Sequence, residues 1–209
     1  MKMTIRIGTF NLYQFVEPPY SWYTKKERFT PLQWIEKTTW IKEQITNMNC
    51  DIIGFQEVFS KLALKELVGD LGFKYFKTVD NARISKNNDK IYTSTTVAIA
   101  SKYPIKNLKK VDIDFLALKK HYYEGFFKFA REPIKATICL EDEKELDVYV
   151  CHLKSNRDNE FEYIFTENSS MDEKIEKVSK ALKENYSVSL KQRLCEASSL
   201  YSNIKRTKR

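Results

Sequence analysis

Three clusters of polar side chains follow short apolar runs in this sequence, and their residue types suit phosphoester chemistry. The clusters are Thr9-Phe10-Asn11, Gln56-Glu57 and His152-Leu153-Lys154-Ser155. The runs before them have the pattern of strands, and layered α/β folds form their sites at strand ends. An amide, a carboxylate and an imidazole at such an edge would suit the hydrolysis of a phosphate ester.

Glu57, in the stretch DIIGFQEV at residues 51–58, is the candidate metal ligand. Mg²⁺ needs only one or two protein carboxylates, because water and substrate phosphate fill its remaining positions. The ion would offset charge on the phosphate oxygens and help to orient the attacking water. By itself Glu57 also fits an ordinary surface carboxylate after a strand, so the hypothesis depends on the residues that accompany it.

His152, Arg131 and Lys154 are the other candidates. An imidazole titrates near neutral pH and could transfer protons during hydrolysis, although His152 also fits a strand-end histidine with ordinary hydrogen bonds. The planar guanidinium of Arg131 suits a phosphate, and the ammonium of Lys154 could also contact one. The alternative for both residues is an ordinary solvated charge. His121, amid lysines and tyrosines, is interpreted as a loop residue.

Strands and helices that alternate along the chain would position these residues. Strands are predicted over residues 4–12, ending at Asn11, and over 51–55, 73–79 and 95–101. The capping box Thr30-Pro31-Leu32-Gln33 predicts a helix to about residue 49, and Ser60 is predicted to cap a second helix closed by Gly72. This order is typical of an α/β layered fold.

The second part of the chain is expected to add a hairpin and helices. Residues 81–94 are predicted to be a long loop, and 129–140 and 146–154 a hairpin around EDEKE. A capping box at Ser170 opens a charged helix. The last helix, at about 189–205, should place apolar residues on one face: Leu190, Leu194, Ala197, Tyr201 and Ile204.

Size and composition limit the class of protein. A chain of 209 residues with 42% hydrophobic residues predicts one folded domain. A net charge of +8, from 36 basic and 28 acidic residues, suits a polyanionic partner or a solubilising surface. No segment approaches the ~20 apolar residues of a membrane span. The four cysteines lack metal-site spacing, so we expect reduced thiols in a cytoplasmic protein.

Five segments in order resemble the endonuclease/exonuclease/phosphatase superfamily, typified by pancreatic deoxyribonuclease. They are TFNL, DIIGFQEV, VAIASKYPI, FAREPIKA and VYVCHLKS, and the resemblance covers roughly residues 4 to 205. FAREP and HLKS look closest to the deoxyribonuclease-like bacterial members. The resemblance implies a four-layer α/β sandwich, with two facing, mostly antiparallel sheets and helices outside. It also implies hydrolysis of phosphodiester bonds with Mg²⁺ or Mn²⁺.

The resemblance assigns a role to each candidate residue. Asn11 matches the asparagine that helps to hold phosphate and metal, and Glu57 matches the metal-binding glutamate. Arg131 matches a phosphate-contacting arginine of the deoxyribonuclease branch. His152 matches the histidine usually cast as the general acid for the leaving oxygen.

The chain also departs from the superfamily pattern. Members continue after a helix like 189–205 into a G-D-x-N motif and later an S-D-H motif, and neither is present here; Gly69-Asp70-Leu71-Gly72 lacks the asparagine and lies at a helix end. We therefore expect residues 1–209 to be a single domain that is incomplete at its C-terminus, with little or no activity. Uncovered sheet edges would favour self-association.

The sequence is compatible with three functions. The first is a metal-dependent nuclease, with DNA expected before RNA as the substrate. The second is a non-catalytic nucleic-acid or phosphate binder, which the basic surface and Arg131 would serve. The third is a phospholipid or inositol-phosphate hydrolase, for which Phe126-Phe127 is the only apolar feature that would face a lipid.

Overall fold

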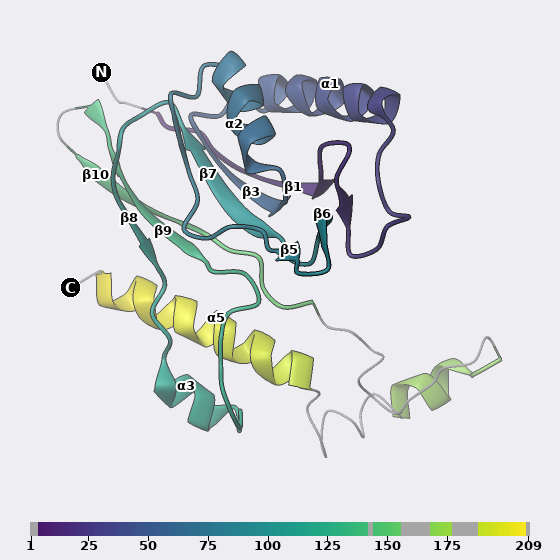
Figure 1. Cartoon of the computed structure of the whole chain (residues 1–209). Helices are drawn as coiled ribbons and strands as arrows, with labels where there is room; N and C mark the ends of the chain where they lie inside the picture. The colour runs from purple at the N-terminus through teal and green to yellow at the C-terminus, as the bar shows by residue number, and fades with distance from the viewer. Residues whose placement is uncertain (1–3, 142–143, 156–167, 177–187, 208–209) are drawn as a thin grey trace. The chain divides into compact units, whose positions relative to one another are not determined.

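The computed structural model describes residues 4–141, 144–155, 168–176 and 188–207 (Figure 1). The chain divides into two compact units: residues 1–110 with 131–152 form unit 1, and residues 111–130 with 153–209 form unit 2. Asn11, Glu57, Arg131 and His152 all belong to unit 1. The expectation of a single domain over residues 1–209 stays a prediction.

The larger sheet of unit 1 contains the strands that carry Asn11 and Glu57. Its order is β1-β3-β7-β4; β1 and β3 run parallel, while β7 is antiparallel to both β3 and β4. Its strands are β1 (Ile7–Phe15), β3 (Ile52–Val58), β4 (Tyr75–Lys77) and β7 (Thr96–Ser101). All residues of β7 are buried, which explains its continuous apolar run.

Two smaller sheets complete the strands of unit 1. One has the order β10-β9-β8 and is wholly antiparallel; the other has the order β2-β6-β5. Their strands are β8 (Ile105–Lys110), β9 (Ile134–Cys139), β10 (Glu145–Val150), β2 (Ser21–Trp22), β5 (Ile84–Ser85) and β6 (Asn88–Tyr92). The predicted hairpin is therefore confirmed as β9 and β10, although its first strand begins at Ile134 rather than at residue 129.

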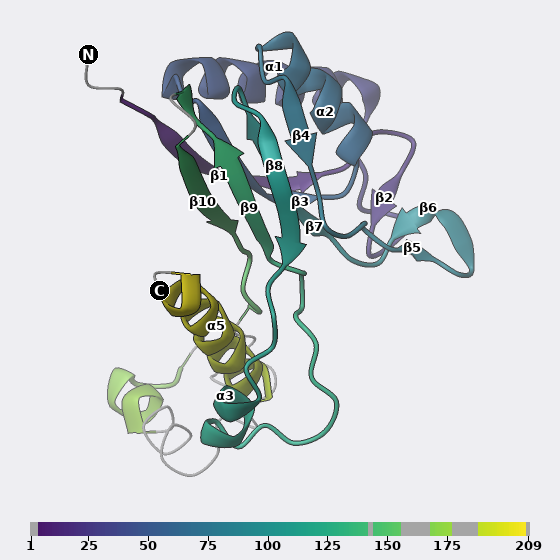
Figure 2. The same cartoon turned by 90° about the vertical axis from the view of Figure 1, so that its left-hand side faces the viewer.

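Two helices cover the outer face of the larger sheet (Figure 2). Helix α1 (Pro31–Met48) begins at the predicted capping box, in which the Thr30 hydroxyl accepts from the Gln33 N–H and the Gln33 side chain accepts from the Thr30 N–H. Helix α2 is Lys61–Asp70. Apolar residues of both helices pack on one face of the sheet, among them Ile41, Ile45, Leu64, Leu67 and Val68.

The opposite face of the larger sheet packs against the β10-β9-β8 sheet. Their shared core contains Ile52, Val97 and Ile99 from one sheet and Ile134, Ala136, Ile138, Val148 and Val150 from the other. The expected α/β sandwich, with two facing and mostly antiparallel sheets, is confirmed, and three of its four expected layers are described in unit 1. In unit 1 the layers run helix, sheet, sheet.

Two of the described helices of unit 2 contact each other. They are α3 (Phe115–Lys120) and α5 (Val188–Thr207). The Asp114 N–H donates to the Ser199 hydroxyl at 3.0 Å. The expected apolar face of α5 is wrong, because Ala197, Tyr201 and Ile204 are exposed; the buried side chains of α5 include Cys195, Ser199 and Leu200.

Other sequence predictions are adjusted in detail. The Ser170 capping box is confirmed, with residues 171–176 helical behind it. Ser60 lies at the start of α2 but makes no side-chain cap, because its hydroxyl accepts from the Glu17 N–H at 2.9 Å. The predicted loop at 81–94 instead contains the β5–β6 hairpin, whose polar residues gave no apolar alternation.

Among the described residues, no helix is both long enough and apolar enough to cross a bilayer.

Candidate functional site

The candidate site lies where the pairing of β1 and β3 becomes irregular. The two strands pair regularly up to Asn11 and Gln56, and pairing resumes only at Phe15 and Val58. Tyr13, Gln14 and Glu57 have positive φ angles of 48°, 61° and 59°. Such angles are costly for residues other than glycine and concentrate at functional sites, and bulges of this kind redirect side chains.

Hydrogen bonds from this irregular segment fix Asn11 and Glu57 together. The Asn11 amide nitrogen donates to Glu57 Oε1 at 3.2 Å, and the Tyr13 N–H donates to Asn11 Oδ1 at 2.9 Å. The Gln14 N–H donates to Glu57 Oε2 at 2.9 Å. The strained conformations of Tyr13 and Gln14 thus aim backbone donors at the two side chains. Oxygen lone pairs on both side chains remain for a ligand.

Thr9 and Gln56, from the same two clusters, bond to each other instead. Gln56 Nε2 donates to Thr9 Oγ1 at 3.1 Å, and the Thr9 hydroxyl lies 3.3 Å from Gln56 Oε1. Thr9 faces Gly54 and Asn11 faces Gln56 in the last regular part of the ladder. This pair therefore stabilises the strand register just before the irregular segment.

Arg131 and His152 flank the same end of the β9–β10 hairpin. Ile134 pairs with Val150, and Arg131 precedes the first of these residues while His152 follows the second. Burial lowers the pKa of His152, the Arg131 guanidinium lowers it further, and the Glu57 carboxylate opposes both. Because both charges affect the pKa of His152, the residues Glu57, Arg131 and His152 lie in one electrostatic neighbourhood. Asn11 belongs to the same group through its hydrogen bond to Glu57.

One nitrogen of the His152 ring is buried without a hydrogen bond to the described residues. Its Nδ1 atom is buried and has no hydrogen-bond partner within the described part of the chain. Buried polar groups in proteins nearly always have a partner, so such an atom calls for an explanation. A substrate group or a water molecule that exchanges a proton with His152 would satisfy it.

Lys37 is a site neighbour that the sequence did not indicate. Its ammonium donates to the Tyr13 carbonyl at 2.8 Å and lies 5.0 Å from the centre of the Phe29 ring. Burial lowers the pKa of Lys37, and the Glu57 carboxylate opposes this shift. The lysine therefore adds positive charge beside the irregular segment of β1. As one of the many basic residues of the chain, it carried no local signal.

Lys154 and a second unpredicted residue, Glu196, belong to unit 2. The Glu196 side chain is 1% exposed; its Oε2 accepts from the Lys154 N–H at 2.6 Å and its Oε1 from the Ala130 N–H at 2.7 Å. Ala130 and Lys154 come just before Arg131 and just after Leu153 in the chain. Glu196 thus ties together the two unit 2 segments that adjoin the candidate residues in the chain, and Lys154 is described as part of unit 2.

His121 has a structural environment. Its Nε2 lies 2.9 Å from the Ser198 hydroxyl of α5, and burial followed by the Lys120 charge lowers its pKa. It is the residue that ends helix α3 rather than a free loop residue. The ring therefore connects α3 to α5.

The oxygen donors of the site fit a magnesium-like ion. No group of three or more histidine, cysteine, aspartate or glutamate side chains that could hold a metal occurs in the described ranges. Glu57 and Asn11 supply one carboxylate and one amide oxygen, which suits an ion that keeps several waters and binds substrate phosphate. Cys50, Cys139, Cys151 and Cys195 form no disulfide with one another.

Comparisons with known proteins gave partial structural likenesses only. No protein-family model and no curated protein matches this sequence. An endonuclease/exonuclease/phosphatase from Beutenbergia cavernae is 14% identical with a TM-score of 0.44, covering 86% of this chain. The human Nocturnin catalytic domain with bound sulfate anion is 19% identical with a TM-score of 0.42, covering 59% of this chain. This chain spans 44% of the length of each.

The first of these structures carries the name of the superfamily that the five sequence motifs resemble. Both likenesses are partial.

Proposed function

We propose that the chain is a divalent-metal-dependent phosphodiester hydrolase that acts on nucleic acid, with DNA expected before RNA. The observation that carries the proposal is the Glu57 carboxylate, held by the Asn11 amide and the Gln14 N–H at a strained end of two parallel strands. Arg131 and His152 lie in the same electrostatic neighbourhood. The carboxylate and amide can bind a metal, the guanidinium can bind phosphate, and the imidazole can transfer one proton in phosphodiester hydrolysis.

Glu57 and Asn11 would hold Mg²⁺ or Mn²⁺. When bound, the ion would offset negative charge on the phosphate and lower the pKa of a bound water. The hydrogen bonds from Asn11 and Gln14 keep the Glu57 carboxylate in place. With a single carboxylate in the site, metal affinity should be low until a substrate phosphate adds its oxygens.

Arg131 and His152 would act on the substrate. The guanidinium offers parallel donors to two phosphate oxygens. The His152 imidazole would transfer a proton, and the superfamily resemblance casts it as the acid that protonates the leaving oxygen. Since its pKa is lowered in the free protein, it would have to gain a proton on substrate binding, which the negative charge of the phosphate favours.

Activity of this chain alone is expected to be low. The sequence has two histidines, and His121 lies in unit 2 bonded to Ser198. His152 is thus the one imidazole of the unit 1 site. General acid or base transfer contributes about 10² to 10⁴ in rate, so a site with one such group should be slow.

The test combines plasmid cleavage with direct metal binding. Purified chain with Mg²⁺ or Mn²⁺ should nick DNA slowly, and EDTA should abolish nicking. Glu57→Gln should lower the rate about 100-fold or more, because the charge stabilisation supplied by a bound metal is worth several kcal/mol. The same variant should weaken Mn²⁺ binding measured by electron paramagnetic resonance in the presence of phosphate.

Glu36→Gln is the matched control, since Glu36 is an exposed carboxylate of α1. It should leave both cleavage and Mn²⁺ binding within about twofold of wild type, as expected for surface substitutions. Cleavage that persists in EDTA, or Mn²⁺ binding unchanged in Glu57→Gln, would contradict the proposal.

A second candidate function is non-catalytic binding of nucleic acid, favoured by the net charge of +8. Binding that weakens steeply with salt, without metal-dependent cleavage, would support it, because phosphate contacts release counterions. Retention on phospholipid vesicles, or hydrolysis of an inositol phosphate in place of DNA, would instead favour a phospholipid or inositol-phosphate hydrolase.

A further inference from the structure

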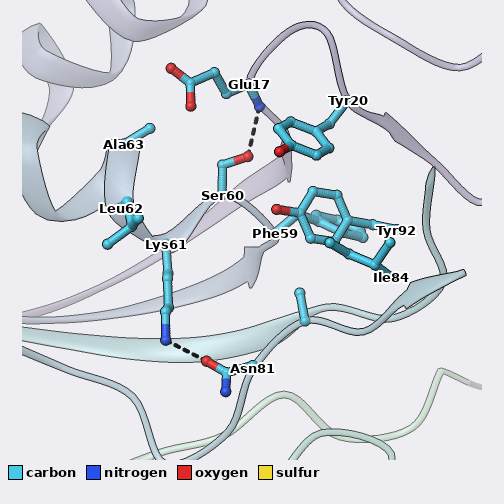
Figure 3. A pocket seen from close by; sticks show the side chains of 11 residues that line it. Glu17, Tyr20, Phe59, Ser60, Lys61, Leu62, Ala63, Asn81, Ile84 and Tyr92 are labelled. Atoms are coloured by element: carbon cyan, nitrogen blue, oxygen red, sulfur yellow. Dashed lines mark hydrogen bonds between the residues drawn. The ribbon is translucent and has the colours of Figure 1, made fainter. Parts of the chain in front are cut away.

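A cavity that the proposed chemistry does not use lies beside the end of β3. Its volume is about 260 Å³, and all of its lining residues belong to unit 1 (Figure 3). This volume is just below the roughly 300–1,000 Å³ of typical small-molecule pockets. A single ring system would therefore fit better than a larger ligand.

Three aromatic rings line the cavity. The ring centres of Tyr20 and Tyr92 are 5.4 Å apart, and those of Phe59 and Tyr92 are 5.7 Å apart. Phe59 is 3% exposed, while both tyrosines are half-buried and present ring surface to the cavity. Ile84, 44% exposed, adds an apolar side chain near the tyrosines. A planar aromatic ligand could stack on these rings, since aromatic faces attract one another in offset or tilted arrangements.

Polar groups surround the aromatic rings. Ser60 is 7% exposed, and its hydroxyl accepts from the Glu17 N–H at 2.9 Å. The Lys61 ammonium bonds to the Asn81 side chain on another part of the lining. Glu17, Lys61 and Asn81 therefore offer both donors and acceptors (Figure 3). A ring with polar atoms on its edge matches this lining better than a hydrocarbon does.

The cavity is close in the chain to the candidate metal ligand. Ser60 comes three residues after Glu57, so their Cα atoms lie within about 11 Å of each other. The Phe59 and Ser60 N–H groups both donate to the Phe15 carbonyl, at 3.2 Å and 3.0 Å, which anchors the cavity wall to the end of β1. A short nucleic-acid strand with a phosphate at Glu57 could place a neighbouring base in the cavity.

We infer that this cavity binds a nucleobase of the nucleic-acid substrate, next to the phosphodiester held at Glu57. The inference rests on the proposed function and adds a second contact to it. Stacking accepts any base, because every base has a π-face, so the cavity would position the strand without selecting a sequence.

The experiment measures binding of deoxyadenosine by saturation-transfer NMR, in EDTA. Deoxyadenosine has a base but no phosphate, so its binding does not depend on the metal site or on catalysis. Deoxyribose and inorganic phosphate are the comparison probes. Wild-type protein should bind deoxyadenosine and not deoxyribose, and phosphate should not displace it.

Two variants test the cavity itself. Tyr20→Ala removes one ring, and Ile84→Asp changes an exposed side chain of β5, which spares the folded core. Each should weaken deoxyadenosine binding, Tyr20→Ala by about 5- to 150-fold, the usual effect of losing one stacked aromatic ring. The matched control Tyr201→Ala, at an exposed tyrosine of α5, and Glu57→Gln should leave it unchanged.

The outcomes separate this inference from the proposed function. No deoxyadenosine binding, or equal binding in wild type and Ile84→Asp, overturns the nucleobase site even if the protein cleaves DNA. Deoxyadenosine binding that is lost in the cavity variants supports the site even if no cleavage is found, and only the nuclease proposal would then fail.

Discussion

Burial and the neighbouring Arg131 guanidinium keep the His152 imidazole mostly neutral at pH 7 in the free protein, because both lower its pKa. The Glu57 carboxylate acts in the opposite direction. Negative charge brought next to this imidazole would raise its pKa and favour its protonation. Substrate binding and protonation of His152 should therefore be coupled.

Substitutions of the two charges should move the His152 pKa in opposite directions. Arg131→Gln removes the nearby positive charge and should raise the pKa, whereas Glu57→Gln removes the negative charge and should lower it further. Added inorganic phosphate should raise the pKa in wild type. Proton NMR titration of the imidazole resonances measures all three.

His121 is the internal control for this titration, because burial and Lys120 set its pKa and it bonds to Ser198. Its titration should not respond to either substitution or to phosphate. Shifts of the same sign at His152 in both variants would contradict the placement of Arg131 and Glu57 around the ring.

The lowered pKa of His152 also has a stability consequence. The unfolded chain binds a proton near pH 6.5, while the folded chain binds it only at lower pH. This residue therefore contributes stability at neutral pH that is lost as the pH falls from about 6.5 toward the folded-state pKa.

At the scale of elements, the distance between the two facing sheets depends on the absence of a side chain at Gly54. A Cβ atom at this position would lie 2.9 Å from both γ-carbons of Val150, across the interface between β3 and β10. Such contacts require the backbone or the valine to move. Gly54 comes three residues before Glu57, so the close approach brings the β10 end, with His152 beyond it, near the β3 end.

Gly54→Ala should therefore destabilise unit 1 by about 1–3 kcal/mol, the usual cost of overpacking. Urea unfolding followed by tryptophan fluorescence reports on this unit, because Trp22, Trp34 and Trp40 all belong to it. Gly69→Ala is the matched control: a Cβ there meets nothing within 4 Å, and alanine should stabilise helix α2 by up to about 1 kcal/mol. Equal effects of the two substitutions would refute the account of the sheet contact.

Local sequence signals predicted the elements better than the contacts between them. The Thr30 and Gln33 side chains complete a box within four residues, so helix α1 could be predicted from its own sequence. Ser60 has the same kind of signal, but its hydroxyl bonds to Glu17, forty-three positions away in the chain. Short strands such as β8 and the β5–β6 hairpin are set by their partners and carry few apolar residues of their own.

For the candidate site, the sequence predicts residue types but not their geometry. The order of the five motifs along the chain, which resembles that of the superfamily, predicts Asn11, Glu57, Arg131 and His152 as site residues. The irregular pairing that aims Tyr13 and Gln14 backbone donors at the site depends on β1 and β3 lying side by side. Glu196 could not be found, because a buried carboxylate on a helix has no signature in the sequence.

For the whole molecule, the open edges of the sheets predict that the chain associates with other copies of itself. Among the described strands, β1 pairs only with β3, and β10 only with β9. Ile7 of β1 is 53% exposed at such an edge. An exposed edge with apolar side chains can pair with another copy of the chain, whereas a lysine at the edge opposes it.

We expect sedimentation velocity to show association that increases with protein concentration and with salt. The net charge of +8 makes copies repel one another, and salt screens this repulsion. Ile7→Lys should reduce association, while the matched control Ile35→Lys, at a 60% exposed isoleucine of α1, should not. DNA binding should weaken with salt under the same conditions, because counterion release drives it. Association that is equally sensitive to both substitutions, or that weakens with salt, would exclude pairing through the β1 edge.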